Sequence, residues 1–140
     1  MNRLSKIIII FSAFFICSCL NFNTGSVSFN NDGIDSKYYG TYESSITIKE
    51  NNNFTSQATA NVVVSSGSAI SIRITGSNIN VYSTAYKENI IKISDNVYKV
   101  SITSSGNKYD FTLSFNNNSM NLSFYANNNT SGEGNLKKIR

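Results

Sequence analysis

The sequence predicts an all-β protein, a small antiparallel up-and-down β-barrel of about eight strands, from three observations. Apolar and polar residues alternate with a period of two in short runs from residue 37 onward. Clusters of Asn, Ser and Gly separate these runs, and those residues favour tight turns. The connections are too short for parallel crossovers, so neighbouring runs have to pair antiparallel. A β-sandwich is the alternative, because it also buries a one-sided apolar sheet.

The composition supports an ordered chain with little scope for catalysis. The 140 residues include no His, no Trp and no Pro, and only 14% are charged. Val, Ile, Phe and Tyr recur throughout, whereas disordered chains lack them. Without His there is no imidazole base, no Ser-His pair and no common metal ligand. Both cysteines lie near the N-terminus, at Cys17 and Cys19. We therefore expect no enzymatic activity, no cofactor and no metal site.

The first residues have the pattern of a secretory signal. Arg3 and Lys6 form a basic region, and the apolar run Ile7–Ile16 follows it. From Ile7 to Leu20 the run is shorter than the about 20 residues that a membrane-spanning helix needs. The basic flank and the terminal position argue against a buried core strand.

The segment Ile16-Cys17-Ser18-Cys19 resembles the lipobox of bacterial lipoproteins, in which a small residue precedes the lipidated Cys. Ser18 is small and Ile16 is not, so Cys19 is the matching residue. The resemblance implies that residues 1–18 are removed and that Cys19 carries a diacylglycerol thioether, often with an N-acyl chain such as palmitate. Two or three acyl chains anchor a protein stably in a membrane.

The resemblance also implies a location. A lipid-anchored protein of the bacterial cell envelope is expected, with the outer membrane or the cell surface favoured. Ordinary cleavage nearby, which would release a free secreted protein, is the alternative.

The charge balance gives no support for nucleic-acid binding. After the signal is removed, 10 basic and 8 acidic residues remain, which is a net charge of +2. The basic residues are scattered, except for Lys137, Lys138 and Arg140 near the C-terminus. A nucleic-acid partner is therefore not expected.

Two further segments follow the signal. Residues 19–36 comprise the lipidated Cys and a stretch rich in Asn, Ser and Gly, which reads as a flexible tether. Its Phe22, Val27 and Phe29 could alternatively add an edge strand. Residues 37–140 form the β-barrel domain, and a single helical turn is expected at Ile34–Tyr39.

Within the domain, one face of each run is apolar and is expected to point to the core. Eight strands leave an interior just wide enough for side chains, so we expect a filled barrel. The polar face could instead line an outer-membrane barrel, but those strands need about 9–11 residues. The run Leu136–Ile139 is expected to close the set. The expected core positions are Tyr42, Ile46, Ile48, Ala58, Ala60, Val62, Val64, Ile70, Ile72, Ile74, Ile79, Val81, Ile91, Ile93, Tyr98, Val100, Ile102, Tyr109, Phe111, Leu113, Phe115, Met120, Leu122 and Phe124.

The start of the domain, Gly40-Thr41-Tyr42, resembles the G-x-W opening of lipocalin-like (calycin) barrels, with Tyr42 in place of Trp. The resemblance implies that this aromatic residue closes one end of the barrel. It also implies that a basic residue late in the last strand packs over the ring, and Lys138 or Arg140 could do so. Such barrels often carry small apolar ligands. Alternatively, Gly40 eases the start of a strand and Tyr42 is an ordinary core residue.

A second resemblance concerns the segment 105–109. Its sequence Ser-Gly-Asn-Lys-Tyr is similar to the S-G-x-K-Y loop of lipoprotein inhibitors of C-type lysozyme. The resemblance implies that Ser105 would enter the enzyme cleft. The cysteine and the Trp-containing second motif of that family are absent. A hairpin turn is the alternative explanation.

Several aromatic residues fall outside the inward pattern, namely Phe54, Tyr82, Tyr86 and Tyr125. Exposed aromatic residues can form a binding surface, although one often packs on a neighbour. The candidate ligand-binding residues are Tyr42, Tyr82, Tyr86, Ser105 and Lys108.

These observations predict a membrane-anchored, non-catalytic binding module for a protein, a glycan or a small ligand, which could be apolar. A structural envelope protein without a soluble ligand is the competing hypothesis. An enzyme ranks third, because the domain has neither a His nor a thiol. The few carboxylates also show no spacing that would pair them across a cleft.

Overall fold

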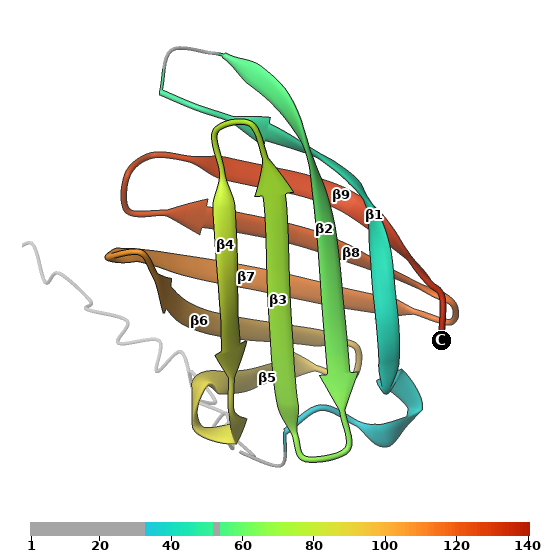
Figure 1. Cartoon of the computed structure of the whole chain (residues 1–140). Coiled ribbons are helices and arrows are strands. Elements are labelled where there is room, and N and C mark those ends of the chain that lie inside the picture. Colours follow the sequence, from blue (N-terminus) through green and yellow to red (C-terminus); the bar gives the residue numbers. More distant parts are fainter. Residues whose placement is uncertain (1–32, 52–53) are drawn as a thin grey trace, which may run out of the picture.

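The computed structural model describes residues 33–51 and 54–140 and shows a nearly closed antiparallel β-barrel (Figure 1). This confirms the predicted fold class over a sandwich. In these two segments no helix is long and apolar enough to cross a membrane. The predicted signal, Cys19 and most of the tether lie outside the described residues. The strands are β1 (Gly40–Lys49), β2 (Thr55–Ser65), β3 (Ala69–Gly76), β4 (Asn80–Ala85), β5 (Ile90–Ser94), β6 (Val97–Ser104), β7 (Asn107–Asn116), β8 (Ser119–Ala126) and β9 (Ser131–Lys138).

The nine strands occupy eight positions around the barrel. Their order is β4-β3-β2-β1-β9-β8-β7-β6-β5, with every neighbouring pair antiparallel. Direction alternates along this series, so β4 and β5 at its two ends run the same way. They are joined by Tyr86 and the short 3-10 helix η2 (Lys87–Asn89). They therefore act as one bent strand, whose first half pairs with β3 and whose second half pairs with β6.

The bend leaves one line along which the sheet is not hydrogen-bonded. Strand β6 contacts β4, yet no ladder joins them. β5 pairs with β6 only over Val97–Val100, so residues 101–104 of β6 face β4 instead. The Tyr82 amide donates across this line to Ser104 Oγ (3.4 Å). We call the line between β4 and residues 101–104 of β6 the seam.

The apolar faces of the strands meet inside the barrel and form one continuous core. At one end Phe115 stacks on Tyr38, with ring centroids 4.4 Å apart, and meets Tyr42 and Tyr98 edge-on. Toward the other end Phe111 lies against Tyr109 and Phe124. These large side chains fill the interior, as expected for a barrel of eight strand positions. Most Ser, Thr and Asn positions of the strands face outward, so the polar face of the sheet does not line a lumen.

The last strand is longer than the sequence pattern indicated. It begins at Ser131, whereas the apolar run was expected from Leu136. Its inward positions before Leu136 are Gly132 and Gly134, which carry no apolar signal. A Cβ on Gly132 would lie 2.4 Å from Phe124 Cε1, and one on Gly134 would lie 2.5 Å from Ile46 Cγ2. Large neighbours therefore fill the space that side chains of β9 would otherwise need.

The prediction that Ile91 and Ile93 are core residues is wrong. Ile91 is 38% exposed and Ile93 is 48% exposed, whereas Ile90 is buried. The 3-10 turn η2 sets the register of β5, and the pairing shifts again between Lys92 and Ser94. Lys92 shares the side of Ile90, where its charge is paired: Nζ lies 3.2 Å from both carboxylate oxygens of Asp35.

A short strap, residues 33–39, packs against the end of the barrel where β1 begins. Ile34 is only 2% exposed, and the 3-10 helix η1 (Ser36–Tyr38) confirms the predicted helical turn. Although burial would raise the pKa of the Asp35 carboxyl, its hydrogen bond and charge contact with Lys92 hold that pKa below the usual value. The packed chain thus begins before residue 37, inside the segment predicted as tether.

Candidate binding site at the seam

Tyr42, the first candidate binding residue, is a core residue. Its side chain is fully buried, and its hydroxyl donates to the Tyr38 carbonyl (2.8 Å). Burial raises the pKa of this hydroxyl, so it stays protonated at neutral pH. Lys138 Nζ lies 5.7 Å from the centre of the Tyr42 ring. The expected cation–ring contact therefore exists, and Lys138, not Arg140, supplies it.

Ser105 lies in the two-residue turn between β6 and β7. Ser104 pairs with Asn107, and the turn residues Ser105 and Gly106 have φ values of 50° and 79°. Positive φ at both positions is typical of a type I′ hairpin turn, for which Gly is the favoured residue. Turn geometry alone therefore accounts for the Ser-Gly-Asn part of this segment.

The remaining candidates, Tyr82, Tyr86 and Lys108, belong to the segments on the two sides of the seam. An outward-opening hollow of about 300 Å³ lies there, and Lys108 is one of its lining residues. Tyr82 and Tyr86 bracket its β4 side and are 70% and 58% exposed. We call this the seam hollow; it is lined by Ser83, Thr84, Asn89, Ser101, Ile102, Thr103 and Lys108.

The missing ladder leaves main-chain groups pointing into the hollow. In an antiparallel strand the N–H and C=O of one residue point to the same side, and successive residues alternate. The Tyr82 amide points to β6, so the backbone N–H and C=O of Thr84, two residues further along, point to β6 as well. The Thr84 hydroxyl is used on the other side, 2.9 Å from Ser71 Oγ on β3. Thr84 thus offers a backbone donor and a backbone acceptor to the hollow.

The side chains of the hollow are mostly hydroxyl and amide groups. The hollow has four hydroxyl-bearing lining residues, and Asn89 adds an amide. Hydroxyl groups both donate and accept, and an amide carries one group of each kind. The hollow is therefore equipped for a ligand with many hydrogen-bonding groups.

The charge in the hollow is nearly balanced. Lys108 Nζ lies 3.0 Å from Asp110 Oδ1, and Ser101 Oγ donates to the same oxygen (2.5 Å). The hydrogen bonds from Ser101 and Lys108 lower the pKa of Asp110 below its usual value, so it is ionised at neutral pH. Both residues of the pair are well exposed, and the pair contributes little to stability.

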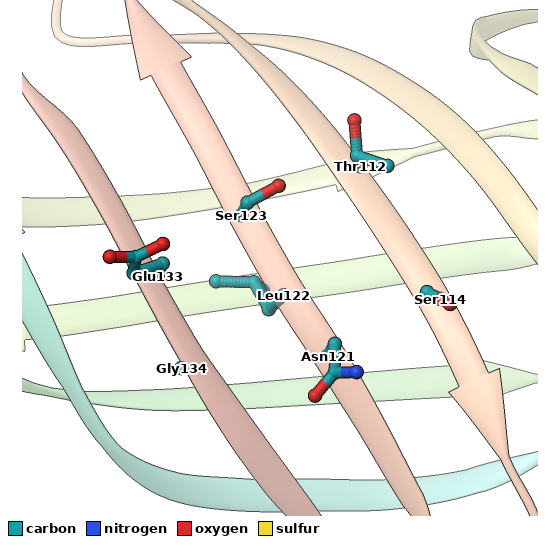
Figure 2. A pocket seen from close by; sticks show the side chains of 7 residues that line it. All are labelled: Thr112, Ser114, Asn121, Leu122, Ser123, Glu133 and Gly134. Carbon is teal, nitrogen blue, oxygen red and sulfur yellow. The ribbon is translucent and has the colours of Figure 1, made fainter.

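A second hollow lies on the outer face of β7, β8 and β9 (Figure 2). Its volume is about 330 Å³, and Thr112, Ser123 and Glu133 stand around it. Leu122 reaches from β8 toward Gly134, which has no side chain to cover it. Its polar groups engage others: Glu133 pairs with Lys49, and Asn121 accepts from Asn135. Core packing at Gly134 explains this hollow, so we do not assign it a ligand.

The other exposed aromatic residues lie away from the seam. Tyr125 is on β8, and its hydroxyl donates to Asn129 Oδ1 (2.6 Å) in the following turn. Phe54 precedes β2 and is 54% exposed. Within the described ranges, no group of three His, Cys, Asp or Glu residues is placed to hold a metal ion.

Sequence reasoning missed most of the hollow. Ser83, Thr84, Asn89, Ser101 and Thr103 belong to residue types that occur on every outward face of this chain. No local signal distinguishes them. The sequence clues were the tyrosines at 82 and 86, which depart from the inward alternation, and Lys108 in the segment 105–109.

Comparisons with known proteins define the class but not the activity. No protein-family model matches the chain, and no curated protein matches it. One solved structure that does match is a redesigned beta barrel, with a TM-score of 0.52 and 16% sequence identity. The match covers 75% of this chain and 94% of that one. At this identity the likeness shows the fold alone, so the chain is a β-barrel protein.

Proposed function

We propose that this protein is a lipid-anchored component of the bacterial cell envelope that binds a ligand, without catalysis, through the seam hollow. The observation that carries the proposal is a polar hollow at the break in the sheet, which Lys108 lines. Exposed Tyr82 and Tyr86 flank the β4 residues that line it. The interior is occupied by the protein's own side chains, so a ligand has to bind outside. The anchor rests on the lipobox-like segment that ends at Cys19.

The carboxylates support binding over catalysis. Asp35 pairs with Lys92, Glu133 pairs with Lys49 and Asp110 pairs with Lys108. Lys92 and Lys108 help to hold the pKa values of Asp35 and Asp110 below their usual values, whereas a general acid needs a raised pKa. The chain has no His that could supply an imidazole for proton transfer.

A relationship to lipocalin-like barrels is part of the proposal. The segment Gly40–Tyr42 opens β1, and Lys138 at the end of β9 lies over the Tyr42 ring. Both features agree with what the resemblance implies. The filled core argues against transport of an apolar ligand inside the barrel.

Two measurements test the proposal. In cells fed labelled palmitate, the wild-type protein should carry the label and Cys19→Ala should not. A label that persists in Cys19→Ala would overturn the proposed lipid anchor.

For the binding role, envelope extracts are passed over immobilised protein, either wild type, the double variant Tyr82→Ser/Tyr86→Ser or the control Tyr125→Ser. The double variant should lose the retained component and the control should keep it. Equal retention by all three, or by none, would favour a structural protein without a ligand at the seam.

A further inference from the structure

We infer that the seam hollow binds a segment of an uncharged oligosaccharide, an inference that rests on the proposed function. The lining supplies hydroxyl groups from Ser83, Ser101 and Thr103 and an amide from Asn89. Thr84 adds a backbone donor and acceptor. Sugar hydroxyls donate and accept at the same time, so they match a surface on which both kinds of group are interspersed.

The two tyrosines give the site its second requirement, an apolar ring beside polar groups. A sugar ring has a face of C–H groups that packs on an aromatic ring, while its hydroxyls need polar partners. Tyr82 on β4 and Tyr86 just beyond it have rings free of the core. Aromatic side chains that are apolar on one side and polar at the tip suit such mixed surfaces.

The spacing of these rings indicates an oligomer. Residue 86 continues the extended backbone of β4, with φ −99° and ψ 172°, so Tyr82, Thr84 and Tyr86 share the outer face. The two tyrosine Cα atoms are then about 13 Å apart along the strand. A ligand that touches both rings is longer than one sugar ring. The hollow, at about 300 Å³, is at the lower end of small-molecule sites and holds only part of such a chain.

Two other ligand classes fit the seam less well. An extended peptide would add to the free edge of β4, but β6 already lies along that edge and Ser104 Oγ accepts the Tyr82 amide. An anionic chain would need unbalanced positive charge. Lys108 is the one charged side chain of the hollow lining, and Asp110 offsets it at 3.0 Å.

The test uses the full-length protein, expressed with its own signal, purified in detergent and labelled with ¹⁵N. The probes are neutral tetrasaccharides of β-linked glucose, α-linked glucose, mannose and N-acetylglucosamine, with a heparin tetrasaccharide as the anionic comparison. At least one neutral probe should shift the amide signals of Tyr82, Thr84 and Tyr86. Its affinity should be nearly independent of salt.

Variants locate the binding. Tyr82→Ser and Tyr86→Ser should each weaken it by about two- to tenfold, and the double variant should lose it. Tyr125 on β8 is also more than half exposed, so Tyr125→Ser is the matched control and should bind like wild type. All three tyrosines are exposed, so these changes leave the core intact.

Several results would overturn the inference. These are no shift at the seam with any neutral probe, binding to the heparin fragment alone, or an equal loss in Tyr125→Ser. The neutral probes could fail to bind while a component of envelope extracts is still retained through Tyr82 and Tyr86. That result would overturn the oligosaccharide inference and leave the proposed binding role supported. If no component is retained either, both the oligosaccharide inference and the proposed binding role are overturned.

Discussion

Lys138 lies on the inward face of β9, opposite Tyr42 on β1. Its Nζ lies over the Tyr42 ring at the end of the barrel where the strap crosses. The stem of a lysine can cover apolar surface while its ammonium group stays near water. A charged residue at an inward position is therefore tolerated here, at the rim, where it covers the buried aromatic cluster.

Lys138→Met tests the value of this contact, because methionine keeps the apolar stem and removes the charge. The free energy of unfolding should fall by about 0.5–1 kcal/mol, the value of a cation–ring contact near the surface. Lys137→Met, one residue earlier on the outward face, is the control. Urea denaturation measures both variants, and an equal change in the two would show that the ring contact contributes nothing.

Gly134 is needed at its position because the backbone of β9 approaches Ile46 closely. Gly134→Ala would place a Cβ 2.5 Å from Ile46 Cγ2 and 3.1 Å from Ile46 Cα. Since backbone atoms cannot move aside cheaply, unfolding should become easier by about 1–3 kcal/mol.

Gly67→Ala is the matched control, since a Cβ there meets no atom within 4 Å. Its stability in urea should be unchanged or slightly higher. A Gly134→Ala protein as stable as Gly67→Ala would contradict the packing of β9 against β1.

At the scale of elements, the bent strand β4–β5 decides which isoleucines enter the core. The 3-10 turn η2 between its halves puts Ile90 inside and Ile91 outside. A period-two pattern cannot distinguish these registers, because Ile90, Ile91 and Ile93 are all apolar. Asp35 on the strap favours the observed one, since it pairs with Lys92 on the inner side.

Alanine substitutions at these two positions test the register. Ile90→Ala should lower the free energy of unfolding by about 2–5 kcal/mol, because it leaves a cavity in the core. Ile91→Ala removes a side chain that is 38% exposed and should cost much less, under about 1 kcal/mol. Thermal or urea unfolding ranks the two; the reverse order would mean that Ile91 is the core residue.

At the scale of the whole molecule, the barrel is closed by ladders at every neighbouring pair except across the seam. On the opposite side, the β1–β9 pairing joins the first and the last strand in chain order. Local opening takes the least energy where the fewest hydrogen bonds break. The seam is therefore the expected site of opening.

Hydrogen exchange should reveal this order. Backbone amides of β4 that face the seam, such as that of Thr84, should exchange fastest among the strands. Amides of β8, which has ladders on both sides, should be among the slowest. Mass spectrometry or NMR measures the rates under native conditions. Equal protection of β4 and β8 would contradict a weak seam.

Much of the candidate site could not be predicted from the sequence, because its residues come together only across the seam. Tyr82 and Tyr86 were identified because they break the alternation. Ser83, Ser101 and Thr103 could not be identified, because a serine or threonine hydroxyl does not indicate a site until its neighbours across the seam are known. The sequence suggested both a core role and a ligand-binding role for Tyr42, and its full burial supports the core role.

The sequence by itself determined which face of most strands is apolar, where the tight turns lie and that Tyr42 begins a buried row. Those features are local, because they follow from the period-two geometry of a strand and the backbone preferences of Gly and Asn. Only the tertiary structure decided that β4 and β5 form one bent strand, that glycines in β9 make room for Ile46 and Phe124, and that a hollow opens at the seam. These depend on contacts between residues far apart in the chain, which no short stretch of sequence encodes.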